Sequence, residues 1–464
     1  MNKINNKNSK GIRQRTYFAV LELLNSIASE QKYPDMLIGE LFKKEDFTPD
    51  EKATVVDMAY GLLRHKGRID HIIGQASSAQ ISSLQLNLLN ILRICTYQLS
   101  FTSTSPAGVV NNAVALTSSY EEGRFTGFVK RTCEALIKNI QNVSFPDREK
   151  NPIEYISIFH SHPKWIVEKW VKEFEDLESV KAPCSSNNFE PPLTIRVNTI
   201  KTDRKKLKEL LKNEGYDSSP TSFSPYGLTV EIKKDIFKTE AFRKGLFEVQ
   251  DEGSQLITLL TGARPEDLVI DACAGNGGKS LFISGLMNNR GTIIAFETHT
   301  GKLGNLRRRA DRAGALNIKT IADAKVLEKY NSSADCVFID APCSGMGVFR
   351  RNPDAKWRLT HQDIQELAVK QKEILREYRK LVKPGGRLVY ATCTISREEN
   401  DEVVQGFLEE NTDFYIVWAS EMNPDILRRF ETKEGFFKSF PHVHNTDGFF
   451  GAVMKRQINA DNAE

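Results

Sequence analysis

The sequence has few cysteines and no long apolar run. Seven cysteines occur among 464 residues without the short, regular spacing of a disulfide framework, which excludes a small disulfide-stapled secreted protein. No run of about 18 apolar residues is present, so no membrane-spanning helix is expected. The basic start MNKINNKNSKGIRQR is not followed by an apolar segment, so no signal peptide is expected. We therefore predict a cytoplasmic protein that does not contact the membrane.

A large excess of charge of one sign is also lacking. The chain has 64 Lys and Arg against 60 Asp and Glu, a balance that allows a nucleic-acid partner without indicating one. The basic cluster RRRADR (residues 307–312) is expected to be the solvated face of a helix. The cluster FRRNPDAKWR (residues 349–358) differs, because its cations share a predicted loop with Trp357. Cations beside an aromatic ring suit phosphate contact combined with base stacking.

Internal repeats and low-complexity segments are absent, and the length predicts two to four domains at about 150 residues each. Residues 1–145 show apolar stripes at helical spacing, which predict an all-helical domain with Cys95 and Cys133 in its core. Residues 146–248 alternate helices with short strands such as LTIRVNT, which predicts a small α+β domain. Within it, KAPCSSNNFEPP (residues 181–192) is predicted to be a loop.

Residues 249–464 alternate apolar strands with helices. DLVIDA, GTIIAFE, CVFIDAP and GGRLVYATC read as strands, and helical segments separate them. This alternation predicts a Rossmann-like α/β domain with a doubly wound parallel sheet. Ligands of such sheets bind beyond the carboxyl ends of the strands, so residues that directly follow a strand are candidates for the functional site.

A glycine-rich loop, DACAGNGGKS (residues 271–280), lies where the first of these strands turns into a helix. Its glycines let the backbone approach a ligand closely, next to the free N–H groups of the helix. The P-loop pattern fails because Cys273 stands where its first glycine is needed, and a full dinucleotide fingerprint fails at Ser280. Glu297 closes the next strand at the spacing of about 20 residues where a carboxylate binds ribose hydroxyls. The pattern predicts an adenosine-like ligand without a pyrophosphate, and S-adenosylmethionine fits.

Two cysteines directly follow strands, Cys343 in VFIDAPCSGMG and Cys393 in RLVYATCTISREEN. A zinc site would need four ligands in close pairs, and no CxxC or HxxxH lies near them, so no metal is expected. A disulfide is disfavoured in the cytoplasm. Burial as an inert thiol is accepted for Cys336, inside its strand. For Cys343 and Cys393 we favour catalysis.

A thiol beside a methyl sulfonium suits one chemistry in particular. Carbon-5 of a pyrimidine is too weak a nucleophile to attack a methyl group, but a thiolate that adds to carbon-6 turns the ring into an enamine whose carbon-5 takes the methyl. A base then removes the carbon-5 proton and the thiol leaves. Asp340 is placed to hydrogen-bond the pyrimidine edge, and Lys279 to supply positive charge that lowers a thiol pKa.

Several ordered motifs carry a resemblance to a known family. The chain resembles the RNA cytosine-5 methyltransferases of the Fmu/Sun (RsmB-like) family in DACAGNGGKS, Glu297, Asp323 of IADAK, DAPCSGMGVFRRNPDAKW, YATCTISREEND and TDGFF. Upstream, SHPKWIVEKW, PLTIRVNT and VQDEGSQ are similar to the middle region of that family. The resemblance implies a NusB-like RNA-binding domain over residues 1–145, a small RRM-like domain over 146–248 and a Rossmann-like S-adenosylmethionine-dependent methyltransferase domain over 249–464.

The resemblance also implies roles for the site residues. Cys393 would be the nucleophile and Cys343 would assist release of the methylated RNA, whereas DNA cytosine methyltransferases use the cysteine of the proline–cysteine motif as nucleophile. The implied substrate is RNA, most of all small-subunit ribosomal RNA, and the protein is expected to be a monomer. Cofactor contacts are implied for Cys273, Ala274, Gly275, Asn276, Gly277, Gly278, Lys279, Glu297, Lys302, Asp323 and Asp340.

The chain departs from the family pattern at three places. Gly275–Asn276 replaces the usual alanine–proline, Glu297 stands where aspartate is common, and Lys302 stands where arginine is more usual. These changes keep the charges and the flexibility of glycine, so cofactor binding is expected to persist. Transfer RNA is an alternative substrate. A non-catalytic RNA-binding ribosome-assembly factor has no need of the two thiols with Asp340 and Lys279, and a small-molecule or protein methyltransferase does not explain the helical domain.

Overall fold

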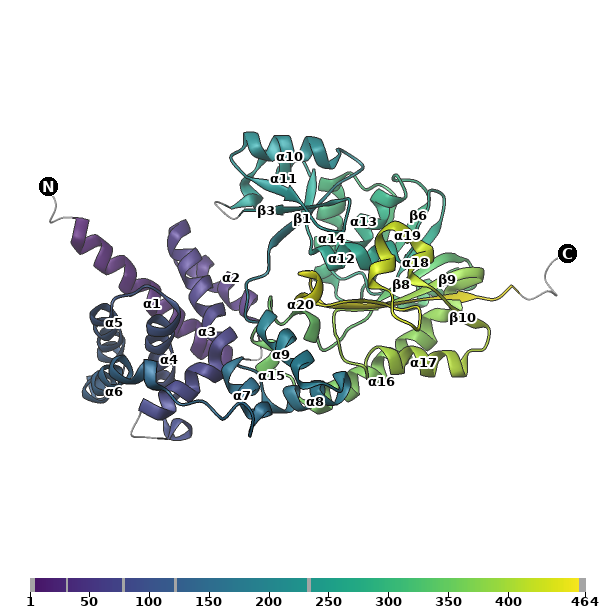
Figure 1. Ribbon diagram of the computed structural model, residues 1–464. Coiled ribbons are helices and arrows are strands. Elements are labelled where there is room, and N and C mark those ends of the chain that lie inside the picture. The colour runs from purple at the N-terminus through teal and green to yellow at the C-terminus, as the bar shows by residue number, and fades with distance from the viewer. Residues whose placement is uncertain (1–4, 31, 77–79, 121–122, 232–234, 459–464) are drawn as a thin grey trace. The chain divides into compact units, whose positions relative to one another are not determined.

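The chain divides into two structural units, seen in the computed structural model in Figure 1. One unit comprises Met1–Phe189 with Asn352–Arg358, and the other comprises Glu190–Arg351 with Leu359–Glu464. The structure describes residues 5–30, 32–76, 80–120, 123–231 and 235–458. No helix in this part of the chain is long and apolar enough to cross a membrane. The domain boundaries near residues 145 and 248 stay predictions.

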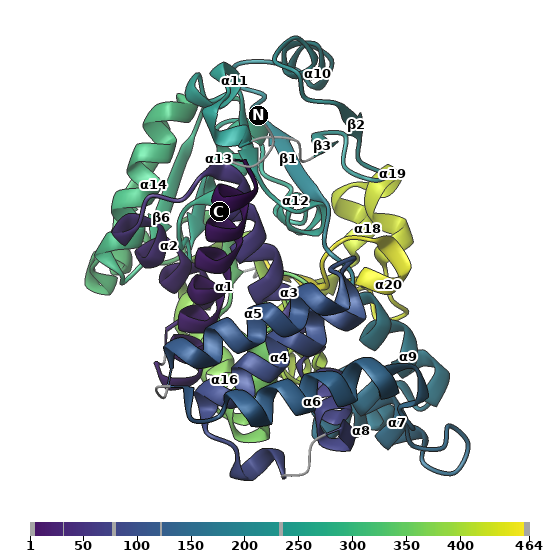
Figure 2. The same ribbon diagram turned by 90° about the vertical axis from the view of Figure 1, so that its left-hand side faces the viewer.

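The first unit is helical, as predicted. Helices α1, α3, α4, α5 and α6 pack side by side (Figure 2) around one apolar core. Its helices are α1 (Asn5–Ser29), α2 (Pro34–Lys44), α3 (Pro49–Ala76), α4 (Leu86–Phe101), α5 (Pro106–Ser119), α6 (Thr126–Asn139), α7 (Pro152–Phe159), α8 (Lys164–Phe174) and α9 (Leu177–Ser186). The buried residues recur every three or four positions, which places them on one face of each helix. They include Val20, Leu21 and Leu24 of α1, Leu88, Ile91, Leu92 and Cys95 of α4, and Val129, Cys133 and Leu136 of α6.

The loop predicted over residues 181–192 is wrong in its first half. Helix α9 continues to Ser186 and contains Pro183, while the Asp176 carboxylate caps its start by accepting hydrogen bonds from the N–H groups of Glu178 and Ser179. Cys184 is fully buried on this helix. Proline removes one helical hydrogen bond, but the burial of this face favours the helix nonetheless.

Residues 352–358, which include the short helix α15 (Ala355–Arg358), belong to the helical unit. Lys356 is fully buried, and its Nζ donates a hydrogen bond of 2.9 Å to the carbonyl oxygen of Arg64 in α3. The indole N–H of Trp357 donates to the Leu63 carbonyl at 2.7 Å. The prediction that this cluster presents its cations and ring to RNA is therefore wrong for Lys356, because backbone carbonyls of the protein already use these groups.

The second unit begins with a small antiparallel sheet in the order β2-β3-β1-β4, flanked by two helices. This arrangement confirms the small α+β domain. An apolar cluster that includes Ile195, Leu207, Leu228 and Phe247 joins the sheet to its helices. The elements are β1 (Leu193–Val197), α10 (Arg204–Asn213), β2 (Ser218–Pro220), β3 (Gly227–Val230), α11 (Glu240–Arg243) and β4 (Phe247–Val249).

The rest of this unit is built on an eight-stranded sheet. Its order is β10-β12-β9-β8-β5-β6-β7, and β11 pairs with β12 beside this path. Strands β5 to β9 are parallel, as predicted, whereas β10, β11 and β12 add antiparallel pairs, so the sheet is mixed. The strands are β5 (Leu268–Asp271), β6 (Thr292–Phe296), β7 (Ile318–Ile321), β8 (Ala334–Asp340), β9 (Val382–Thr392), β10 (Phe414–Val417), β11 (Phe437–Ser439) and β12 (Phe449–Arg456).

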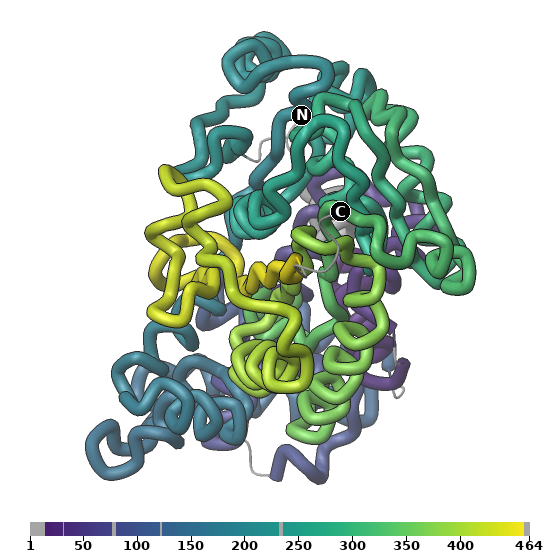
Figure 3. Tube along the Cα trace, turned by 90° about the vertical axis from the view of Figure 1, so that its right-hand side faces the viewer, coloured from purple at the N-terminus to yellow at the C-terminus, as the bar shows by residue number. Residues whose placement is uncertain are grey.

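Helices cover both faces of this sheet, which Figures 1 and 3 show from different sides. Successive strand residues alternate between the faces, so Ile270, Val337, Ile339 and Leu388 pack in one core with α16 and α17. Val269, Cys336, Phe338 and Val389 pack in the other with α12 and α13. The helices are α12 (Glu252–Leu259), α13 (Gly278–Leu286), α14 (Thr300–Ala313), α16 (His361–Tyr378), α17 (Asp401–Glu410), α18 (Ala419–Met422), α19 (Pro424–Leu427) and α20 (Pro441–His444). The Rossmann-like class is confirmed.

Lys356 makes the stability of the helical unit depend on pH. Burial lowers the pKa of Lys356 to about 7, below the value of about 10.4 in an unfolded chain. Between these values the folded state binds fewer protons than the unfolded state, so wild-type stability rises as pH rises through this window. Lys356→Met lacks this titration, so its free energy of unfolding should not share the rise. Relative to wild type, we expect it to fall by at least about 1 kcal/mol between pH 6 and pH 10. Urea unfolding at both pH values measures the difference. The exposed Lys172→Met is the control, and an equal pH dependence in both variants would contradict the assignment.

Candidate active site

Two thiols meet at the carboxyl edge of the large sheet. Strands β8 and β9 are parallel neighbours, and Asp340 pairs in register with Ala391. Cys343 lies three residues beyond Asp340 and Cys393 directly follows β9. The two Sγ atoms are 3.3 Å apart. Cysteines that are distant in sequence therefore lie in one site, because the strands that precede them end side by side.

The two thiols have different surroundings. Both side chains are partly exposed, so both are accessible from the ligand edge of the sheet. The hydrogen bond with Cys393 and then burial raise the pKa of Cys343 well above its usual value. Cys343 is therefore a protonated thiol at neutral pH.

Lys279 and Asp340 form an ion pair beside the thiols. Lys279 Nζ donates to Asp340 Oδ2 at 2.6 Å, with the side chains 15% and 30% exposed. Burial opposes the charge of Lys279, but Asp340 outweighs it and Cys393 acts in the same direction, so the pKa of Lys279 is raised. Lys279 is thus a fixed cation that favours a negative charge on Cys393. Asp340 Oδ1 receives no hydrogen bond from the residues that the structure describes and stays available to a ligand.

The glycine-rich loop connects β5 to α13. Ala274 N donates to the carbonyl of Phe296 in β6 at 2.9 Å, which ties the loop to the neighbouring strand. Gly275 has φ +54°, and no protein atom lies within 4 Å of a Cβ added there. The backbone is therefore open to a ligand at this point, as a cofactor cradle requires. Burial raises the pKa of Cys273, so its thiol is inert.

The other predicted cofactor residues lie at neighbouring strand ends. Glu297 follows β6 and Asp323 follows β7. Glu297 accepts a hydrogen bond from His299 N at 2.9 Å and lies 3.6 Å from Lys302 Nζ, while Asp323 accepts from Lys325 N at 3.0 Å. Carboxylates at such strand ends suit ribose hydroxyls and an ammonium group. Together with the open backbone at Gly275, these residues fit S-adenosylmethionine.

A buried carboxyl group lies beneath the loop. Ser280 Oγ donates to Asp271 Oδ2 at 2.6 Å, while Asp271 Oδ1 is buried without a hydrogen-bond partner. Burial raises the pKa of Asp271 to about 7, against the opposing effect of the Ser280 hydrogen bond. Below this pH the carboxyl group is neutral, which removes the cost of an unpaired charge under the loop.

Glu399 joins the two thiol loops, and no sequence motif indicated its role. Its buried carboxylate accepts hydrogen bonds from Ser344 N at 2.8 Å, Ser344 Oγ at 2.5 Å, Thr394 Oγ1 at 3.2 Å and Gln371 Nε2 at 3.1 Å. Ser344 follows Cys343 and Thr394 follows Cys393. Burial raises the pKa of Glu399, and the hydrogen bonds oppose this shift. No periodicity or spacing marks this residue, because its partners come together only in the folded sheet.

The late motif TDGFF closes the same region. Gly347 N donates to the Cys393 carbonyl at 3.0 Å, and Gly448 N donates to the Gly347 carbonyl at 2.8 Å. A Cβ at Gly347 would lie 2.2 Å from the Gly448 oxygen, so only glycine allows this approach. Arg350 is buried and donates to Asp447 at 2.7 Å. The prediction that the cations of residues 349–358 suit phosphate contact is therefore wrong for Arg350, because a buried carboxylate already binds its charge.

Cys336 is fully buried within β8, which confirms it as a core residue. No group of three or more His, Cys, Asp or Glu side chains in the described ranges is arranged to hold a metal ion. The site thus offers two thiols, a lysine–aspartate pair and an open glycine loop. This combination suits transfer of a group from a bound cofactor to an acceptor held by a thiol.

Three family profiles match the chain in the order of its parts. The NusB family matches residues 13–130, and the ferredoxin-like domain of RsmF/B-like methyltransferases matches residues 162–236. The profile of 16S rRNA methyltransferase RsmB/F matches residues 258–455. The ferredoxin-like profile covers β1, β2 and β3 of the small sheet, within the region that was predicted to be an RRM-like domain.

Similar proteins cover nearly the whole chain. The sequence is 30% identical over 444 residues to the probable ribosomal RNA small subunit methyltransferase B of Bacillus subtilis, covering 94% of this chain and 98% of that protein. It is 27% identical over 431 residues to the ribosomal RNA small subunit methyltransferase B of Proteus mirabilis, covering 91% and 94%.

Solved structures share the fold. The crystal structure of a protein called PH0851 has a TM-score of 0.79 and 25% identity, covering 96% of this chain and 99% of that chain. NSun6 from Pyrococcus horikoshii with SFG has a TM-score of 0.55 and 22% identity, covering 63% of this chain and 98% of that chain, which supports the fold alone. With a full-length relative at 30% identity and matching profiles in order, the chain belongs to the 16S rRNA methyltransferase RsmB/F family and is an S-adenosylmethionine-dependent RNA methyltransferase.

Proposed function

We propose that this enzyme methylates carbon-5 of a cytosine in small-subunit ribosomal RNA through a covalent bond to Cys393. The observation that carries the proposal is the pair of thiols 3.3 Å apart at adjacent strand ends, beside a lysine–aspartate pair. An acceptor that is already nucleophilic needs neither thiol. The names of the full-length relatives support ribosomal RNA of the small subunit as the substrate.

In the first step the Cys393 thiolate forms a bond to carbon-6 of the cytosine. The electron pair of the carbon-5–carbon-6 double bond moves between carbon-4 and carbon-5, and N3 takes up the displaced pair together with a proton. Carbon-5 becomes the nucleophilic carbon of an enamine. Lys279 assists by stabilising the thiolate before attack, because its ammonium group is held in place by Asp340. When bound, S-adenosylmethionine would supply the electrophilic methyl group for carbon-5, and its carbon–sulfur bond would break to leave a neutral thioether.

Residues around the base hold it and accept its charge. The free Oδ1 of Asp340 is suited to accept a hydrogen bond from the exocyclic amine or from protonated N3 of the cytosine. The loop from Cys273 to Lys279, with Glu297, Lys302 and Asp323, would hold the cofactor. Because Cys393 lies at the edge of a buried sheet, the target base must be unpaired or flipped out of a helix to reach it.

In the last step the adduct resolves. Cys343 first gives its own proton to solvent and then, as a thiolate, takes the proton from carbon-5. The carbon-5–carbon-6 double bond forms again, and the bond from carbon-6 to Cys393 breaks to return its thiolate. The hydrogen bond with Cys393 is the largest cause of the raised pKa of Cys343. Once Cys393 is bonded to the cytosine this hydrogen bond is lost, so the pKa of Cys343 falls from its raised value, which favours loss of its proton.

Alanine variants of the two cysteines should be blocked at different steps of the reaction. With tritium-labelled S-adenosylmethionine and small-subunit ribosomal RNA that lacks the modification, Cys393→Ala should lower methyl transfer by at least about 10³-fold. Cys343→Ala should accumulate a covalent protein–RNA adduct, seen as a slower band on a denaturing gel. Tritium release from RNA labelled at cytosine carbon-5 reports the position of methylation.

The buried Cys184→Ala is the matched control and should retain methyl transfer. Full activity of Cys393→Ala would show that the nucleophile is assigned wrongly. Labelling of transfer RNA and not of ribosomal RNA would show that transfer RNA is the substrate. If wild type labels no RNA, a non-catalytic binding factor is favoured.

Glu399 should position the thiols rather than bind substrate. Glu399→Ala removes the acceptor that joins Ser344 to Thr394, and a displacement of about 1 Å lowers kcat by about 100-fold. Glu399→Gln keeps one acceptor oxygen and should lose less, about tenfold. KM for RNA and for S-adenosylmethionine should stay unchanged. As pH falls, protonation of Glu399 weakens its hydrogen bonds and lowers the kcat of the wild type. Gln does not titrate, so this decrease of kcat at acidic pH should be absent from Glu399→Gln.

The exposed Glu402→Gln in α17 is the control for charge and should keep the wild-type kcat. A wild-type kcat for Glu399→Ala, or an effect on KM alone, would contradict the positioning role.

A further inference from the structure

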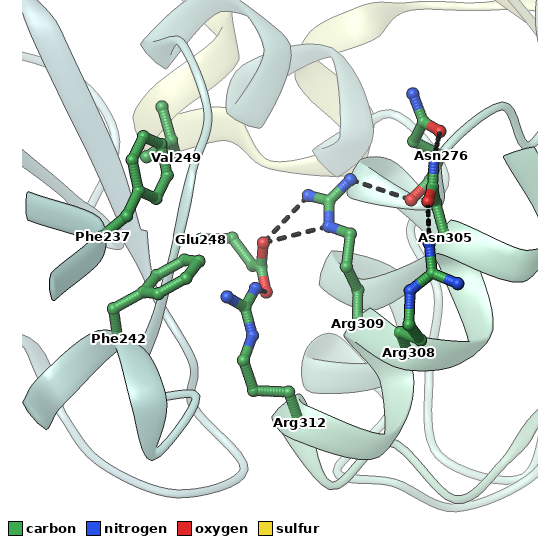
Figure 4. Close-up of a pocket in the computed structure, with 9 residues that line it drawn as sticks. All are labelled: Phe237, Phe242, Glu248, Val249, Asn276, Asn305, Arg308, Arg309 and Arg312. Carbon is green, nitrogen blue, oxygen red and sulfur yellow. Dashed lines mark hydrogen bonds and ion pairs between the residues drawn. The ribbon is translucent and has the colours of Figure 1, made fainter. Parts of the chain in front are cut away.

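A cavity of about 420 Å³ lies next to the glycine-rich loop, outside the thiol site (Figure 4). One wall carries the rings of Phe237 and Phe242. The other carries guanidinium groups of α14, from Arg308, Arg309 and Arg312. Figure 4 shows the two walls facing each other, with Glu248 of β4 between them. None of these residues takes part in the mechanism above.

The aromatic wall presents an exposed ring. Phe237 is 54% exposed, although a phenylalanine ring gains free energy from burial. It lies edge-on to Phe242, with ring centroids 5.0 Å apart, and its backbone N–H donates to Asp235 Oδ1 at 3.1 Å. The Arg312 guanidinium covers the Phe242 ring at 3.7 Å from the centroid. One ring is therefore committed to the protein, and the other is held in place with a surface free for stacking.

The basic wall is built on a buried carboxylate. Glu248 is 4% exposed and binds both Arg309, at 2.9 Å, and Arg312. The prediction that residues 307–312 form only a solvated helix face is thus wrong for these two arginines, whose side chains are 27% and 19% exposed. Arg308 lies on the exposed side and donates to Asn305. Three guanidinium groups against one carboxylate leave a positive cavity.

Positive charge beside an exposed aromatic ring favours a ligand that has both a negative charge and a flat ring. An apolar molecule would use only the ring and would leave the excess positive charge of the arginines without a counter-ion, and an acidic peptide would not use the ring. A nucleotide satisfies both walls, because its phosphate pairs with arginine and its base stacks on an aromatic face. The volume is within the range of about 300–1,000 Å³ typical of small-ligand pockets.

We propose that this cavity binds one nucleotide of the RNA substrate other than the target cytosine, with its base on Phe237 and its phosphate on Arg308. The inference rests on RNA as the substrate in the proposed function. The site also adjoins the cofactor loop, since Arg309 Nη1 donates to the Asn276 carbonyl at 2.8 Å. RNA bound here would therefore run past the loop that is expected to hold the cofactor.

The test uses full-length Phe237→Ala and Arg308→Ala, both changes at exposed side chains. Kd for a fluorescent fragment of small-subunit ribosomal RNA is measured by anisotropy across a salt series. Phe237→Ala should raise Kd by about 5- to 150-fold, the range for loss of one stacked base. Arg308→Ala should raise Kd and reduce the slope of log Kd against log salt by about 0.7, one phosphate contact on a single strand. The kcat at saturating RNA and the KM for S-adenosylmethionine should not change.

Phe189→Ala and Arg290→Ala, at side chains 68% and 60% exposed outside the cavity, are the matched controls and should bind as wild type. Wild-type Kd for both cavity variants, or equal loss in the controls, would overturn the proposal. The outcome is separable from that of the proposed function. An active Cys393→Ala refutes the covalent mechanism and leaves RNA binding at the cavity measurable, whereas adduct formation with unaffected cavity variants refutes the cavity alone.

Discussion

The parallel pairing of β8 with β9 is the constraint on which the rest of the site depends. The pairing of Ile339 with Tyr390 and of Asp340 with Ala391 fixes where each strand ends. Both strands are buried on both faces, so a slip by one residue would move their apolar side chains to the wrong core. It would also shift one thiol by about 3.3 Å along the strand. The distance between the sulfur atoms is thus set by core packing far from the chemistry.

The charged side chains at this edge of the sheet are paired with other protein groups. Lys279 is fixed by Asp340, and the Glu399 carboxylate is fixed by four donors from three segments. Buried polar groups with complete hydrogen bonding make a network rigid, and leaving one unpaired is costly. The same groups that stabilise the loops therefore position the thiols, so stability and catalysis rest on shared contacts.

The departure from the family pattern at Asn276 acquires a structural reason. Its side-chain oxygen accepts a hydrogen bond from Asn305 at 3.1 Å and its carbonyl accepts from Arg309. A proline at this position would lack the side-chain contact. Asn276 therefore links the loop to α14, whose arginines in turn bind Glu248 of the small sheet. The cofactor loop, the cavity and the small sheet form one connected part of this unit.

Sequence alone determined the order of the domains, the glycine-rich loop and the two cysteines after strands, because these depend on local periodicity and on what directly follows a strand. It did not determine that α9 continues through Pro183, that Lys356 and Arg350 are buried, or that β12 inserts antiparallel beside β9. Glu399 and the arginine cavity were likewise decided only by the tertiary structure. Each of these features depends on which distant segments pack together. The free energy of such contacts depends on strand register and burial, which a local sequence pattern does not predict.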